Sequence, residues 1–302
     1  MVWVESLRTN RLASMSIVLA SQDWLQRRDH HQRRVTKLLG QYLQRRAEGK
    51  TNPVVDFLFT YYNLTPGQLR RWHPGFGVTL TGPESRVYEN RRGYRRTGSG
   101  VGVDPEYLAR RRPTVEYVAR LLTATANRPA NLACFGLHEW AIVYRAEPEQ
   151  LRHHVPLRLG HTGTDAVVES MPLRCTHFDA FRFFTDSARR RNGAQLTRAG
   201  QVTAEQPGCL HTGMDLYRFA AKLLPLVDSD LLMDAFELAY AARELDMRAS
   251  PYDLSAFGYE AVPIELASGR AEYVRQQAAL AKRSASVRLI LVRRCQELLA
   301  PL

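Results

Sequence analysis

The chain of 302 residues has few cysteines, few lysines and no long hydrophobic run. Its four cysteines stand far apart without a CxxC pair, which argues against a structural zinc cage. Reduced thiols in a cytoplasmic protein are therefore the expectation, and we expect no cofactor. No stretch approaches the roughly 18 consecutive apolar residues of a membrane-spanning helix, so we expect no membrane contact.

Lysine is scarce because arginine carries the basic charge. The chain has four lysines and 38 arginines, and its formal net charge is +12. The whole excess falls within residues 1–130, while residues 131–302 are neutral overall. Such an asymmetry predicts an acidic partner: DNA held through its phosphates, an anionic substrate, or an acidic carrier or partner protein. A solvated basic face is the plainer alternative.

Helical spacing of apolar residues predicts a mainly α protein. The clearest helices are expected at residues 21–46 and 229–245, and the C-terminal stretch is expected as two helices that end near residues 281 and 299. A small β or irregular element is expected near residues 76–103, where short β-like pieces lie at 78–80 and 87–89. We divide the chain into residues 1–14 (unstructured or a mis-called start), a basic helical region 15–130, and a helical region 131–302 that carries the site.

Polar residues gathered among apolar ones mark candidate sites, because a buried polar group without a partner costs about 1–3 kcal/mol. In the run FGLHEW, Glu139 next to His138 could act as a general base and its orienter. Neighbours on a helix face different ways, so the two could also serve separate contacts. Trp140 is a candidate surface for a planar ligand.

A second cluster is the run RCTHFDAFRFF. If it is extended, His177 and Asp179 share one face and Arg182 lies opposite. Phe181 and Phe183 could wall a flat pocket of the kind a flipped base needs. A packed aromatic core with an internal ion pair is the alternative, and a metal at His177 and Asp179 would lack an identifiable third ligand.

Two further segments combine charge with a chain break. His211 follows a Pro-Gly turn at a helix start, two residues after Cys209, with which it could form a base–nucleophile pair. Arg248 and Asp253 flank the break at Pro251, where they could equally tie a helix end to its neighbours.

Several runs also carry a resemblance: FGLHEWAIVYR, PLRLG, RCTHFDAFRFF, EQPGCLH, MDLY, LDMRASPYDL, NPVVDFLFTYY and LRRWHPGFGV. They resemble a high-GC bacterial family whose members are labelled 3-methyladenine DNA glycosylase, over roughly residues 20–290. The resemblance implies excision of alkylated purines from DNA. For that reaction we expect Asp179 or Glu139 to stabilise the oxocarbenium-like sugar, with His177 and Asp253 as further catalytic candidates. Trp140, Phe181 and Phe183 would stack the base.

Two other functions fit the same residues. A biosynthetic enzyme of secondary metabolism could displace a sulfate or phosphate leaving group, for example in a ring closure on an amino acid held by an acidic carrier protein. The anion would then be clamped by several arginines, and the candidates for substrate contact are Arg158, Arg174, Arg182, Arg248 and His211. A nucleic-acid-binding protein without catalysis is the third reading, although binding alone does not need dense buried polar clusters.

Overall fold

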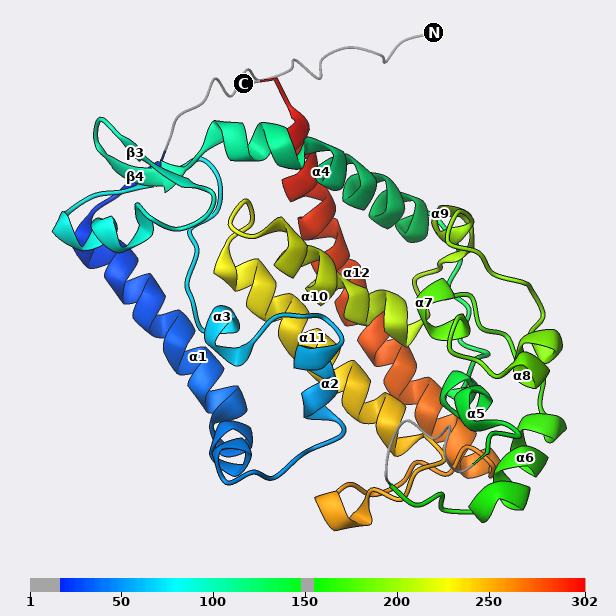
Figure 1. Ribbon diagram of the computed structural model, residues 1–302. Coiled ribbons are helices and arrows are strands. Elements are labelled where there is room, and N and C mark those ends of the chain that lie inside the picture. The colour runs from blue at the N-terminus through cyan, green and yellow to red at the C-terminus, as the bar shows by residue number, and fades with distance from the viewer. Residues whose placement is uncertain (1–16, 148–154, 302) are drawn as a thin grey trace, which may run out of the picture.

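A computed structural model describes residues 17–147 and 155–301, so the expectation for residues 1–14 lies outside the described part. Figure 1 shows a mainly α fold with one small sheet, as predicted. The helices are α1 (Ser21–Ala47), α2 (Val55–Thr60), α3 (Pro66–Leu69), α4 (Pro105–Ala126), α5 (Leu137–Val143), α6 (Gly160–Ser170), α7 (Phe178–Phe181), α8 (Asp186–Arg191), α9 (Gln201–Ala204), α10 (Leu210–Leu223), α11 (Ser229–Arg248) and α12 (Ala267–Leu299), with 3-10 turns at Pro83–Tyr88 and Ser255–Phe257.

The sheet has four short strands in the order β1-β2-β4-β3: β1 (Ile17–Leu19), β2 (Val78–Leu80), β4 (Gly100–Val103) and β3 (Tyr94–Thr97). The expected β element near residues 76–103 is confirmed, and β1 joins it in parallel to β2. The expected piece at 87–89 is wrong. Pro83, at the start of a 3-10 turn, directs the chain into local bonds such as Ser85 N–H to the Gly82 carbonyl.

Helices α10, α11 and α12 form the centre of the molecule, with α4 crossing α12 (Figure 1). Their buried faces belong to one hydrophobic core that also takes in Trp24 and Leu39 of α1 and Leu58 of α2. The C-terminal stretch is one helix, not the two expected, because no glycine or proline interrupts it between Gly269 and Leu299.

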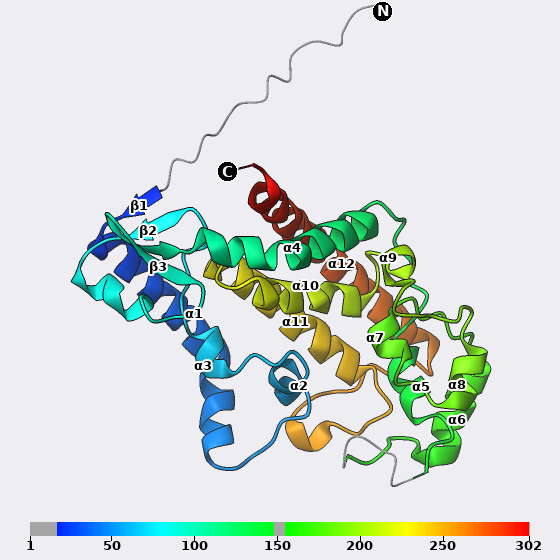
Figure 2. The same ribbon diagram turned by 45° about the horizontal axis from the view of Figure 1, so that its top comes forward.

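The short helices α5 to α8 gather at one end of α10 and α11, and α2 approaches the same end from the N-terminal region (Figure 2). This arrangement places residues from 57 to 252 around one small volume. Within residues 17–147 and 155–301, no helix combines the length and apolar character needed to cross a membrane.

Candidate functional site

A buried polar network runs through the junction of these helices. Each contributing segment supplies between one and three titratable side chains, most of them buried. The members are His138 and Glu139 of α5, His177 and Asp179 at the start of α7, Glu205 after α9, His211, Asp215 and Arg218 of α10, and Arg243 and Asp246 of α11.

The first half of the network consists of His138, Glu139, Arg243 and Asp246, and Asp246 contacts both His138 and Arg243. Its Oδ1 lies 2.7 Å from His138 Nε2, and its Oδ2 accepts a bond from Arg243 Nη1 at 3.1 Å. The same Arg243 nitrogen donates to Glu139 Oε1 at 2.9 Å. His138 and Glu139, neighbours on α5, therefore meet through α11 and not directly. Cys134 Sγ, 3.2 Å from His138 Nδ1, extends the chain of contacts in the other direction.

The carboxyl groups of this half have opposite pKa shifts. Burial raises the pKa of Glu139, and the proximity of Asp246 adds to it, while Arg243 opposes the shift only in part. For Asp246 burial acts in the same sense, but His138 and Arg243 outweigh it and hold its pKa well below the usual range. Burial disfavours a charged His138, yet the adjacent Asp246 raises its pKa well above the ordinary value. Asp246 therefore holds its charge more readily than Glu139, whose pKa is raised.

His211 joins the two halves. Its ring lies edge-on to His138 with centroids 4.5 Å apart, and stacks on His177 at 5.3 Å. Burial and the charge on His138 lower its pKa well below the ordinary value, which keeps the imidazole neutral. Its Nδ1 is buried and has no hydrogen-bond partner within the described residues. Such an atom is an available acceptor or donor for a ligand.

His177 anchors the second half. Its Nε2 lies 3.3 Å from Asp215 and 3.4 Å from Glu205, and all three side chains are almost completely buried. Burial lowers the pKa of His177, but these two carboxyl groups reverse the effect and raise it. Burial raises the pKa of Glu205. His177 is not among the residues that line the pocket, and its contacts join Asp215 of α10 to Glu205 in the segment before it.

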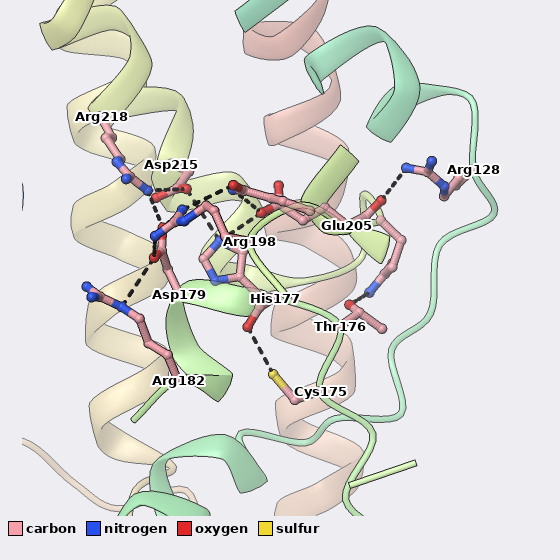
Figure 3. A network of polar contacts seen from close by, with 12 residues as sticks. Arg128, Cys175, Thr176, His177, Asp179, Arg182, Arg198, Glu205, Asp215 and Arg218 are labelled. Atoms are coloured by element: carbon pink, nitrogen blue, oxygen red, sulfur yellow. Dashed lines mark hydrogen bonds and ion pairs between the residues drawn. The ribbon is translucent and has the colours of Figure 1, made fainter. Parts of the chain in front are cut away.

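Asp179 binds three arginines, as Figure 3 shows. Arg198 donates to both of its oxygens, at 2.5 and 3.1 Å, Arg218 donates at 2.5 Å, and Arg182 Nε lies 3.3 Å away. Burial alone would raise the pKa of Asp179, but the bonds from Arg198 and Arg218 hold it well below the usual range. The expected extended segment is wrong: residues 178–181 form a helical turn, which brings Arg182 to the side of Asp179.

A pocket opens against this network. Four of its ten lining residues are Phe or Tyr and three carry a carboxylate or guanidinium group, and its volume is about 40 Å³, room for roughly three water molecules. The residues that line it are Phe57, Tyr61, Glu139, Ile142, Asp179, Ala180, Phe183, His211, Arg243 and Tyr252. Glu139, whose pKa is raised, and His211, whose pKa is lowered, both line it. Paired groups of this kind suit general acid–base chemistry.

The structure brings some predicted residues to this pocket and leaves others elsewhere. Glu139, Asp179, Phe183 and His211 line it, and Arg182 lies at its edge beside Phe183. Trp140 and Phe181 are buried core residues that do not line it. Trp140 donates its indole N–H to the Ala249 carbonyl, and large apolar rings at a helix junction are more valuable as packing.

The remaining candidates lie apart from the pocket. Arg158 forms a two-bond pair with Glu265, and together with Arg248 and Asp253 it lines a separate cavity of about 400 Å³. Asp253 accepts the Ser255 N–H and caps a turn. Arg174 is exposed. The four arginines expected to clamp an anion therefore do not converge.

The candidates predicted from the sequence omit several members of the site. Arg243 and Asp246, and likewise Asp215 and Arg218, stand three residues apart on largely buried helices. A charged pair at that spacing on an otherwise apolar face is a readable signal of a buried ion pair. Arg198 lies in a loop with no periodicity, and only the fold reveals its contact with Asp179.

Two groups of side chains in the described part have ligand atoms close enough for one metal ion: His138, Glu139, His211 and Asp246, and separately His177, Glu205 and Asp215. In the first group, Arg243 Nη1 already lies between the two carboxylates. In the second, Arg218 binds Asp215. A metal would have to displace these guanidinium groups, so the arrangement fits an arginine-balanced proton network better than a metal centre.

The two phenylalanines provide a direct check of the pocket assignment. We expect Phe181→Ala to lower the free energy of unfolding by about 3–5 kcal/mol, because the ring is only 5% exposed and packs in the core. Phe183 is partly exposed, so Phe183→Ala should cost about 1 kcal/mol or less. Urea unfolding of both variants measures the difference. Equal losses would place Phe183 in the core and contradict the assignment.

Comparison of the chain with protein-family models, with curated proteins and with solved structures found no match.

Proposed function

We propose that the pocket is the active site of an enzyme that hydrolyses the N-glycosidic bond of alkylated purines in DNA. The observation that carries the proposal is Glu139, a buried carboxyl group with a raised pKa, which lines a pocket together with four aromatic side chains. A neutral histidine, His211, lies beside it. This combination meets the needs of the reaction: a stacking surface and one proton acceptor.

Cleavage of this glycosidic bond needs little help from a general acid. An alkylated purine is cationic, so its bond to the sugar C1′ breaks with the electron pair going to the base nitrogen. Ionised Glu139 would stabilise the oxocarbenium-like sugar and take the proton of the water whose oxygen bonds to C1′. Asp179 is less suited to this role, because three arginines already use its charge.

The aromatic rim is where a base would enter. A pocket of about 40 Å³ is much smaller than the roughly 300 Å³ of ordinary ligand sites. Phe57 and Tyr61, stacked at 4.8 Å, and Phe183 are partly exposed and form the rim. The proposal therefore includes an outward rotation of rim side chains when substrate enters, a change within the ordinary range for exposed residues.

The basic N-terminal region supports a DNA substrate. Helix α1 and α11 border an open groove of about 540 Å³, lined by His30, Arg33, Arg34, Lys37, Leu38 and Glu237. Phosphate contacts made by such a surface would be sequence-independent.

A biosynthetic displacement reaction remains the second candidate, and one observation favours it. The three arginines on Asp179 lie at the edge of the pocket, where they could bind a sulfate or phosphate leaving group. The arginines predicted for that role from the sequence, apart from Arg182, lie elsewhere.

Release of free base tests the first candidate. We expect the protein to release 3-methyladenine from methylated duplex DNA and nothing from unmodified DNA, measured by chromatography of the soluble bases. The matched comparison is the Glu139→Gln variant at equal concentration. Absence of release from methylated DNA would overturn base excision and transfer the proposal to the displacement reaction.

A further inference from the structure

We propose that Arg182, Arg198 and Arg218 form a binding site for a tetrahedral anion, a phosphate or sulfate group, at the edge of the aromatic pocket. All three guanidinium groups contact one carboxylate, Asp179, which is only 2% exposed. As a part of the substrate site the proposal rests on the proposed function, but binding without turnover tests it separately.

The charges at this place do not balance. Three arginines face Asp179 and Asp215, which leaves one positive charge in excess before Lys222 on the next turn of α10 is counted. Burial, and after it the nearby Arg218, lowers the pKa of Lys222. Like charges held this close repel one another in a partly buried site. A bound dianion would remove that repulsion.

The guanidinium groups also keep N–H donors that Asp179 does not use. Arg182 and Arg198 are 42% and 50% exposed at the side chain, so their guanidinium groups reach solvent while one edge of each stays fixed on Asp179. Arg218 uses Nη1 for both Asp179 and Asp215. Each guanidinium carries five N–H donors, more than one carboxylate can accept.

Aromatic rings pack against the guanidinium groups of two of these arginines. Arg182 lies over Phe183 at 4.3 Å and Arg198 over Phe178 at 4.8 Å from the ring centres. Asp179 and these rings thus preorganise the arginines. Binding of an anion would therefore cost less side-chain conformational entropy than it would at mobile surface arginines. Figure 3 shows the three arginines converging on Asp179 from different segments.

Phosphate is the test anion. We expect the melting temperature of the wild-type protein to rise with sodium phosphate or sulfate in a saturable way, and not with sodium chloride at equal ionic strength. Arg182→Gln and Arg198→Gln should each weaken the fitted phosphate affinity about tenfold, as loss of a charge-assisted contact does. Arg190→Gln, which removes an exposed arginine of α8, is the matched control and should leave the affinity unchanged.

Three outcomes would overturn the site: no saturable effect of phosphate on the wild type, unchanged affinity in both Gln variants, or an equal loss in Arg190→Gln. A single-stranded oligonucleotide identifies the source of the anion. If it competes with phosphate and binds Arg198→Gln more weakly than wild type, the site takes a nucleic-acid phosphate. If phosphate binds but the oligonucleotide does not compete, the site takes the phosphate or sulfate of a small molecule. Both results support the anion site, and neither depends on base release.

Discussion

Glu139→Gln is expected to lower kcat/KM for base release by about 10²- to 10³-fold, roughly 3–4 kcal/mol of transition-state stabilisation. The substitution keeps the shape of the side chain and removes its ability to ionise. Burial raises the pKa of Glu139 above the ordinary value of about 4.3, so wild-type activity should increase with pH as Glu139 loses its proton, later than an exposed glutamate would. In the variant this increase should disappear. A pH series of initial rates measures both effects.

Glu265→Gln is the matched control for this prediction. Glu265 also pairs with an arginine, Arg158, at 2.9 Å, but it does not line the aromatic pocket. The activity of the Glu265→Gln variant should therefore match that of the wild type. Full activity of Glu139→Gln, with a circular dichroism spectrum like that of the wild type, would remove Glu139 from the mechanism and return the catalytic role to Asp179.

Arg243→Leu is expected to lower the free energy of unfolding by about 3–5 kcal/mol. Arg243 is 1% exposed and bonds both Glu139 and Asp246, so its loss leaves two carboxyl groups buried side by side without their shared cation. Its guanidinium also lies 4.1 Å from the ring centre of Phe57. Urea denaturation at neutral pH measures the loss.

An arginine that pairs with the same helix, α11, provides the control. Arg34 of α1 pairs with Asp234 and Glu237 of α11 at 2.6 and 2.7 Å, but these carboxylates are 45% and 35% exposed. Water can replace the lost arginine there, so Arg34→Leu should cost about 1 kcal/mol or less. Similar losses in the two variants would show that burial of the Arg243 network contributes nothing to stability.

Local sequence was sufficient for some of the helices, though not for α7, which carries Asp179. The apolar spacing of residues 229–245 fits α11, and Thr65 with Gln68 forms the capping box of α3. These features depend on residues within one or two turns of each other, which is why a pattern can reveal them. It was not sufficient for the contacts at the start of α11: Asp228 caps the helix, while the Ser229 hydroxyl accepts the backbone N–H of His73 from the N-terminal region.

By itself the sequence determined the mainly α class, the clustering of polar residues near 138, 177, 211 and 248–253, and the concentration of basic charge in residues 1–130. The tertiary structure alone decided which of those residues meet. Asp246 reaches His138 across 108 residues, and Asp179 finds Arg218 across 39. Such pairs form because a buried charge needs a partner at about 3 Å, and only the packing of α5, α7, α10 and α11 sets which partner lies that close. The same packing separated Glu139, at the pocket, from Asp253, in an exposed turn.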